Sequence, residues 1–320
     1  MRKIIAIGES VLDTVFENRQ PVKAFVGGRI ANAAASLGML GIHVSMVSEC
    51  CTDIVGDTII DFFNRHQVDV KSIDRFTDGA TAFSTIFNDP QETRIVNYGK
   101  YPDDRFDVVW PRIDEDDIVI FGSLYAIDVP QRERLFEMIS YAAERKAIII
   151  YLPGFQHGIN FRITKVMPAI LENLEIADLV LALDSDINTI FPGEAPEEAF
   201  KNHIGFYDNT YIHVNPDFSL NLFGHNRRQS FPADGTTANL LGWQAGFTAG
   251  MAYHIIERGL LRSDLHNASA EVLAALVDEA SKFAQCCAQS ADNCITPQFA
   301  QGKRAALEKA QQLRDQAAQK

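Results

Sequence analysis

The sequence FVGGRIANAAASLGMLG, residues 25–41, places two glycines directly before a helix. After Gly27 and Gly28, the pattern of apolar residues predicts a helix over about 29–39. Glycine lets the backbone pass close to a ligand, and the start of a helix presents free N–H groups together with the polar side chain of Asn32. This segment therefore predicts a ligand site at a helix N-terminus.

Short apolar runs on both sides of this segment alternate with amphipathic stretches. The runs cover residues 4–7, 44–47, 118–121, 147–151, 179–183 and 211–214. Further helices are expected over about 56–66, 131–145, 237–258 and 268–288, with 303–320 as a solvated helix or a fraying tail. This alternation is typical of an α/β fold in which helices cover both faces of a doubly wound, mainly parallel sheet.

Two segments break this rhythm. Residues 14–26 and 81–98 alternate apolar and polar side chains, and Asn88-Asp89-Pro90 supplies a hairpin turn in the second segment. We expect both to form strands of a small separate sheet. Because the chain shows neither an internal repeat nor a low-complexity linker, a single domain with an accessory element is expected.

Composition excludes several classes of function. The 320 residues include 42 acidic and 29 basic side chains, and the net charge of −13 argues against nucleic acid as a partner. We expect a cytoplasmic protein, because the sequence has neither a signal peptide nor a membrane span. The five cysteines lack zinc-ligand spacing, and P-loop, GxGxxG and Ser-His-Asp motifs are absent. No resident metal is therefore predicted.

Residues 25–41 resemble the first signature of the PfkB family of carbohydrate kinases, in which two glycines precede a helix that carries an asparagine. Other pieces fall in family order: Gly8-Glu9, Asp13, Asp53-Ile-Val-Gly56, Gly122-Ser123 and Ala245-Gly246-Phe247. The resemblance covers nearly the whole chain and is closest to the fructokinase and ribokinase branches. It implies a ribokinase-like three-layer sandwich over residues 1–320, with a β-lid formed by about 12–28 and 79–101.

The resemblance also implies a sugar site. In the family, residues like Asp13 and Asn32 hydrogen-bond the sugar beside the glycine pair, and the lid segment ending near Tyr98 closes over it. The alternative is that Asp13 caps a turn and that Asn32 is a polar residue on the edge of a helix. Because the family's lid often pairs two subunits, a homodimer through the β-lid is expected.

The second family signature, DTxGAGDxF, departs from the family pattern in this chain. Its aligned stretch is residues 235–243, in which GAGD is replaced by Ala238, Asn239, Leu240 and Leu241. Leu241 occupies the position of the family's base and cannot accept a proton, and side chains at 238–240 crowd the phosphate-binding backbone. Asp234 is the nearest substitute base, although a capping role is the ordinary interpretation of such a residue.

The nucleotide and metal elements have also changed. The family's Asn-x-x-Glu element aligns with residues 183–186, where Asp186 replaces the glutamate and the amide is lost. The nucleotide-contacting turn aligns with 215–220, which lacks both glycines and contains Pro216. We therefore expect ATP and Mg²⁺ to be used only if kinase activity is retained.

Three functions remain open from the sequence. The first is a carbohydrate-kinase homologue, or pseudokinase, that binds a small sugar or polyol while phosphoryl transfer is weak or lost. The second is an active ATP-dependent sugar kinase with a displaced base. The third is a dimeric interaction protein that binds neither ligand, against which the retained Asp13, Gly27, Gly28 and Asn32 speak.

Overall fold

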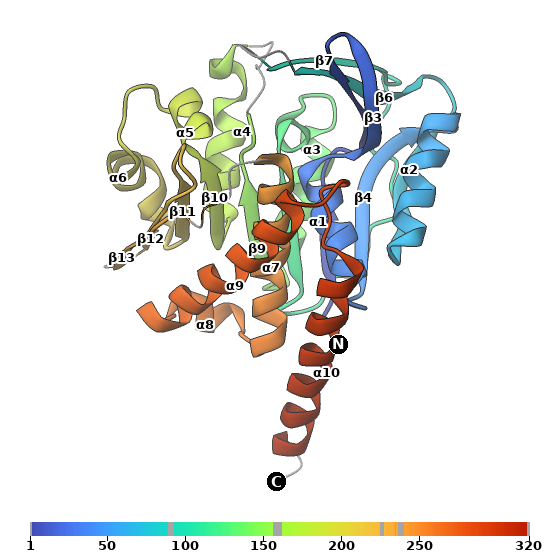
Figure 1. Cartoon of the computed structure of the whole chain (residues 1–320). Helices are drawn as coiled ribbons and strands as arrows, with labels where there is room; N and C mark the ends of the chain where they lie inside the picture. Colours follow the sequence, from blue (N-terminus) through green and yellow to red (C-terminus); the bar gives the residue numbers. More distant parts are fainter. Residues whose placement is uncertain are drawn as a thin grey trace.

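The computed structural model describes residues 2–88, 93–155, 162–224, 227–233, 235 and 240–318. Its framework is a large sheet in the order β13-β12-β11-β10-β9-β8-β1-β4-β5 (Figure 1). The strands are β1 (Ile4–Ile7), β4 (Val44–Cys51), β5 (Val68–Phe76), β8 (Ile118–Gly122), β9 (Ile148–Leu152), β10 (Leu179–Leu183), β11 (Thr210–Val214), β12 (Leu220–Gly224) and β13 (Arg227–Phe231). From β11 to β5 the neighbours run parallel, and β12 and β13 add an antiparallel edge.

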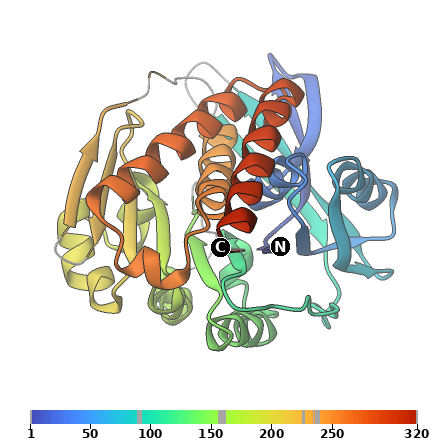
Figure 2. The same cartoon turned by 90° about the horizontal axis from the view of Figure 1, so that it is seen from below.

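Both faces of this sheet are buried, because successive side chains along a strand point to opposite sides. Ile4 and Ala6 belong to one core, whereas Ile5 and Ile7 belong to the other. The first core is covered by α1 (Arg29–Gly38), α2 (Ile54–Arg65), α7 (Leu240–Arg258), α9 (Ala270–Ala288) and α10 (Pro297–Ala318). The second is covered by α3 (Arg132–Glu144), α4 (Ile163–Ile176) and α5 (Asp184–Ile190), as the view from below shows (Figure 2).

The direction of winding reverses at β1, which pairs in parallel with β4 on one side and β8 on the other. Ile7 therefore lies beside both Val47 and Phe121. In open α/β sheets a ligand crevice forms at such a reversal, outside the carboxyl ends of the strands. The segments that follow β1 and β8 are consequently brought together at this edge.

Four strands form a separate small sheet in the order β3-β2-β6-β7, at the top of Figure 1. They are β2 (Val11–Glu17), β3 (Gln20–Gly27), β6 (Ala80–Asn88) and β7 (Thr93–Lys100). These are the segments for which the sequence predicts such a sheet. The predicted turn at Asp89 and Pro90 lies outside the described residues, and the role of the sheet as a lid stays a prediction.

Several elements differ from those expected. The sequence analysis does not include β5, the hairpin β12–β13 or α4. The two outermost strands, β5 and β13, carry polar side chains among the apolar ones, so they lack the continuous apolar run of a central strand. The helix expected from 237 is described from Leu240 onward. The C-terminal helix α10 begins earlier than expected because Ala300 and Leu307 pack against the core.

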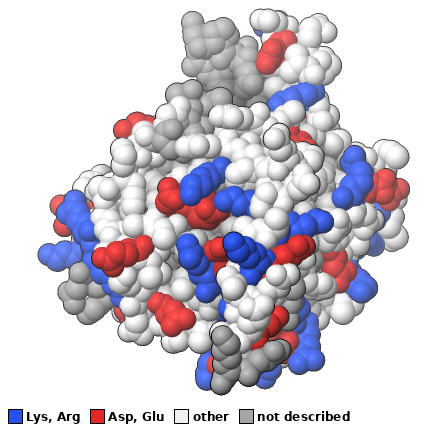
Figure 3. All heavy atoms as spheres, turned by 60° about the horizontal axis from the view of Figure 1, so that its bottom comes forward, with Lys and Arg blue, Asp and Glu red and all other residues white. Residues whose placement is uncertain are grey.

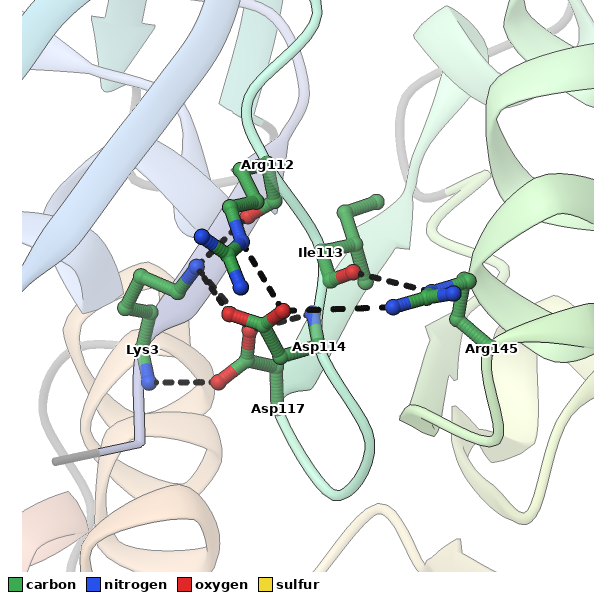
Figure 4. Close-up of polar contacts among 6 residues, drawn as sticks. All are labelled: Lys3, Arg112, Ile113, Asp114, Asp117 and Arg145. Carbon is green, nitrogen blue, oxygen red and sulfur yellow. Dashed lines mark hydrogen bonds and ion pairs between the residues drawn. The ribbon is translucent and has the colours of Figure 1, made fainter.

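A charged cluster holds together the opposite, amino edge of the sheet (Figure 4). Asp117 is buried, and its carboxylate accepts hydrogen bonds from the backbone N–H groups of Lys3 and Asp114, both at 2.8 Å. The Asp114 carboxylate accepts from Lys3 Nζ at 3.1 Å and Arg112 Nε at 3.0 Å, and these bonds lower the pKa of Asp114. The carboxylates of this amino edge therefore have partners and fix the loop that enters β8.

Acidic and basic residues are interspersed on the face shown in Figure 3. Because opposite charges lie close together there, that face is a solvated surface without a large electrostatic potential of one sign. Among the helices of the described part of the chain, none has the length and apolar character needed to cross a membrane.

Candidate functional site

A cavity of about 740 Å³ lies where the carboxyl edge of the large sheet meets the small sheet. Its walls come from the segments after β1 and β8, the start of α1, the small sheet and the start of α7. The residues on these walls include Glu9, Asp13, Gly28, Arg29, Asn32, Phe83, Ser84, Tyr98, Ser123 and Leu241. The cavity therefore occupies the crevice that the reversal of winding creates.

Asp13 lies on β2 and is only 6% exposed. Its carboxylate Oδ1 accepts a hydrogen bond from the hydroxyl of Ser84 on the adjacent strand β6. Burial raises the pKa of Asp13 from 3.8 to about 6; the Ser84 hydrogen bond opposes this shift, and the charge of Glu9 adds to it. A carboxyl group held at the cavity in this way is a strong acceptor for a ligand hydroxyl.

The glycine pair makes room for this carboxylate. A Cβ atom on Gly27 would lie 1.9 Å from Asp13 Oδ2. Gly28 has φ +102°, and a Cβ atom there would lie 2.3 Å from the backbone oxygen of Glu9. The sequence predicts that the glycines allow a close approach to a ligand, whereas the structure shows that their close contacts are with Asp13 and Glu9. Gly28 lines the cavity, and Gly27 lies behind Asp13.

Asn32 is buried in the first turn of α1 and lines the cavity. The thiol of Cys294 lies 3.7 Å from the backbone oxygen of Asn32 and 4.0 Å from its Oδ1. The sequence gives no sign of this contact, because the two residues are 262 positions apart. The structure thus brings Asp13, Gly28 and Asn32 to one cavity, as their joint spacing predicts.

Tyr98 lies on β7 of the small sheet and is 49% exposed. Its ring stacks on Phe83 of β6, with 4.8 Å between the centroids and 16° between the planes. Both residues border the cavity, but the strand register points their side chains to the face of the small sheet opposite to that of Asp13 and Ser84. The stacked pair therefore lies on the exposed face of the small sheet, and contact of Tyr98 with a ligand stays a prediction.

One wall of the cavity carries charged residues that the sequence does not predict. The guanidinium of Arg105 donates to Glu49 Oε2 at 3.0 Å and to Asp128 Oδ2 at 2.7 Å, and it lies 4.1 Å above the ring of Tyr101. Burial raises the pKa of Glu49, and the hydrogen bond from Arg105 opposes that shift. The residues come from distant segments of the chain, so local spacing carries no signal of them.

Leu241 lies in the first turn of α7 and lines the cavity, whereas its neighbour Leu240 packs against the core. The position that the resemblance assigns to the proton acceptor therefore borders the cavity with an apolar side chain. Asp234, Ala238 and Asn239 lie outside the described residues.

Asp186 does not border the cavity. It is fully buried at the start of α5, where its Oδ1 accepts from the N–H of Phe155 at 2.6 Å and its Oδ2 from the N–H of Leu183 at 3.1 Å. This carboxylate is engaged in joining the ends of β9 and β10. Its assignment to nucleotide or phosphate binding stays a prediction that these contacts do not support.

The turn that follows β11 is closed upon itself. Asn215 N–H donates to Ser219 O at 2.9 Å, and the N–H of Ser219 donates to Asp217 Oδ1 at 2.9 Å. Phe218 has φ +65°, and its ring packs against the buried Trp243 of α7 at 5.5 Å. Backbone donors that a phosphate would need are thus used within the turn. Within the described ranges, groups of three or more His, Cys, Asp or Glu that could hold a metal ion are absent.

Comparison with known proteins agrees with this geometry. The sequence model of the pfkB family of carbohydrate kinases matches residues 1–202. A 5-dehydro-2-deoxygluconokinase of Clostridium perfringens is 28% identical over 137 residues, which make up 40% of this chain and 39% of that protein. The matched part therefore spans about two fifths of the length of this curated relative.

Solved structures share the fold over nearly their whole length. A fructokinase with bound ATP from Xylella fastidiosa aligns with a TM-score of 0.77 at 16% identity, over 94% of this chain and 97% of that one. An uncharacterized sugar kinase from Pyrococcus horikoshii aligns with a TM-score of 0.75 at 17% identity, over 95% and 99% of the two chains. The α/β, ribokinase-like fold predicted from the sequence is confirmed.

Proposed function

This chain belongs to the pfkB family of carbohydrate kinases, and we propose that it binds a small sugar or polyol in its cavity while phosphoryl transfer is weak or lost. One observation carries the proposal. Asp13, Gly28 and Asn32 converge on the same cavity that Leu241 borders. Polar groups suited to a sugar are therefore present, and an apolar side chain stands where the family places its base.

The cavity offers each part of a sugar a fitting contact. The Asp13 carboxylate accepts hydrogen bonds from hydroxyl groups, and the Asn32 amide can both donate and accept. Ile86 and Ile95, which line the cavity on the same face of the small sheet as Ser84, offer an apolar surface to the C–H face of a sugar ring. Burial strengthens these hydrogen bonds because the local dielectric constant is low.

The described residues do not fit the ATP and Mg²⁺ that the family would imply. Both carboxylate oxygens of Asp186 accept hydrogen bonds from backbone N–H groups. In the turn at Asn215–Ser219, backbone N–H groups donate to acceptors within the same turn.

The replacements act on different parts of one reaction. A general base contributes about 10²–10⁴-fold to a rate, and an oxyanion donor about 10²–10³-fold. These losses need not multiply. Against a typical turnover of about 10 s⁻¹, even the loss of the base alone leaves very slow transfer.

An active ATP-dependent sugar kinase is the second candidate, and the catalytic name of the Clostridium relative favours it. It would require Asp234 as the base, because Leu241 cannot take the proton.

We also propose that two copies of the chain pair through the small sheet. That sheet leaves apolar surface exposed at Val22, Phe83, Val96 and Tyr98, which a second copy would cover. In this picture the partners are a small sugar and a second subunit.

Thermal shift against D-ribose, D-fructose, D-glucose and MgATP tests the proposal. A ligand at 100 times its dissociation constant stabilises the folded protein by about 2.7 kcal/mol. We expect at least one sugar to raise the melting temperature and MgATP to leave it unchanged.

Replacing Asn32 identifies the site. Asn32→Ala should lower the affinity for the sugar that stabilises the parent by about tenfold, because a hydrogen-bonding group is lost from a buried position. Asn64→Ala, on the exposed side of α2, is the matched control and should bind like the parent. Equal affinity of parent and Asn32→Ala would show that the sugar binds elsewhere.

A further inference from the structure

Ser123 has an unusual backbone conformation at the carboxyl end of β8. Its φ is 57° and its ψ is −164°, in a region that is essentially reserved for glycine and costs other residues about 1–3 kcal/mol. Its N–H donates to Leu152 O at 2.8 Å, and its own oxygen accepts from the N–H of Ala126 at 3.3 Å. The surrounding backbone therefore holds a side chain at a place where glycine would be relaxed.

The strained residue directs a buried hydroxyl to the cavity. Ser123 is 2% exposed and borders the cavity, yet its Oγ makes no hydrogen bond within the described part of the chain. The same holds for Oε2 of Glu9, which follows the neighbouring strand β1. A buried polar atom without a partner costs about 1–3 kcal/mol, so two of them at one cavity require an explanation.

The space around these atoms is kept open. Gly154, with φ +67°, lies so close that a Cβ atom there would be 2.7 Å from Arg29 Nη1 and 3.1 Å from Ser123 Oγ. Burial raises the pKa of Glu9, and the charge of Arg29 and the nearby Ser123 hydroxyl oppose that shift. Ser123 Oγ thus lies beside the Glu9 carboxyl and lowers its pKa, but the two groups do not reach ordinary hydrogen-bond geometry.

We propose that Ser123 and Glu9, flanked by Arg29, form a second polar subsite of the cavity that binds a hydroxyl group of a neutral polyol. This subsite is separate from Asp13 and Asn32, and the inference rests on the proposed sugar site. A hydroxyl group is the fitting ligand because it can donate to the carboxylate of Glu9 and accept from Ser123 Oγ. The carboxylate of Glu9 offsets the charge of Arg29, so a phosphate or carboxylate gains little there.

The subsite explains why strain is retained. Glycine at 123 would relax the backbone, but it would remove the hydroxyl group that donates to the ligand. A sugar bound at both subsites must present hydroxyl groups at two separate positions. We therefore expect D-fructose, D-ribose or D-glucose to bind more tightly than D-gluconate or D-fructose 6-phosphate.

Ser123→Gly tests the inference, because it should alter stability and affinity in opposite directions. The ligand-free variant should melt about 2 °C higher than the parent, since strain and an unpartnered hydroxyl are both removed. Calorimetric titration with the neutral sugar that stabilises the parent should show affinity reduced about tenfold. Ser123→Ala should lose the same affinity without the gain from the relaxed backbone.

The outcomes separate this inference from the sugar site itself. If Asn32→Ala weakens the sugar and both Ser123 variants bind it like the parent, the subsite is refuted and the sugar site stands. If none of the three neutral sugars binds the parent, both fall. Tighter binding of D-gluconate or D-fructose 6-phosphate that depends on Ser123 would overturn the assignment to a neutral ligand.

Discussion

The two sides of the cavity differ in how their polar groups are used. On the side of β1, α1 and the small sheet, Asp13 and Asn32 face the cavity, and Ser123 keeps a hydroxyl without a partner among the described residues. On the side of α7 and β10, the corresponding polar group, Asp186, is bonded to backbone N–H groups, and Leu241 is apolar. Polar groups of the first side face the cavity, whereas the carboxylate of the second side is bonded within the fold.

Under the proposed function, this difference separates a sugar side that is kept from a nucleotide side that is lost. Groups kept desolvated and partly unpartnered reduce stability, so they persist where a ligand satisfies them. The amino edge of the same sheet provides a reference, because the carboxylate of Asp117 is buried there with both oxygens bonded. At the sugar side, by contrast, Glu9 keeps one carboxylate oxygen without a hydrogen bond among the described residues.

The largest effect should come from Gly28→Ala, which alters the backbone on the side of the cavity formed by β1, α1 and the small sheet. Its Cβ atom would meet the backbone oxygen of Glu9 at 2.3 Å in a backbone conformation with positive φ, so the segment must move. We expect a loss of about 3 kcal/mol or more of unfolding free energy, measured by urea denaturation, together with loss of sugar binding.

Gly302→Ala on α10 is the matched control, because its Cβ atom would meet nothing within 4 Å. That change should stabilise the protein by about 0.5–1 kcal/mol through helix propensity. Equal stability of the two variants would mean that the glycine pair does not shape the site.

Asp13→Asn should produce a smaller effect of opposite sign. Burial raises the pKa of Asp13 to about 6 from 3.8, so the protonated form is favoured by folding, and the stability it gives below pH 4 is lost as the pH rises through 6. Asparagine removes this loss, which amounts to about 3 kcal/mol at pH 7.

The variant should consequently be more stable than the parent above pH 6, equal to it near pH 3, and weaker in sugar binding. Thermal melts at several pH values would show this divergence. A variant less stable than the parent at pH 7 would mean that the Asp13 carboxylate contributes to stability like that of Asp117.

The sequence predicts the parts of this structure that depend on local pattern. Continuous apolar runs give the central strands, and the spacing of Asp13, Gly28 and Asn32 gives the side of the cavity formed by β1, α1 and the small sheet. The Arg105 wall and the contact between Cys294 and Asn32 depend on residues that only the tertiary fold brings together. The backbone of Ser123 could not be predicted, because β-strand ends rarely require a non-glycine residue in that conformation.

Sugar-dependent release of ADP from MgATP is the measurement that tests the difference between the two sides most directly. With a sugar that stabilises the parent, we expect ADP release at or near the rate of the reaction without protein. Leu241→Asp should leave it there, because Asp186 and the turn at Asn215–Ser219 keep their polar groups in internal hydrogen bonds. Turnover by the parent near about 10 s⁻¹, abolished by Asp234→Asn, would contradict the account and identify an active kinase with a displaced base.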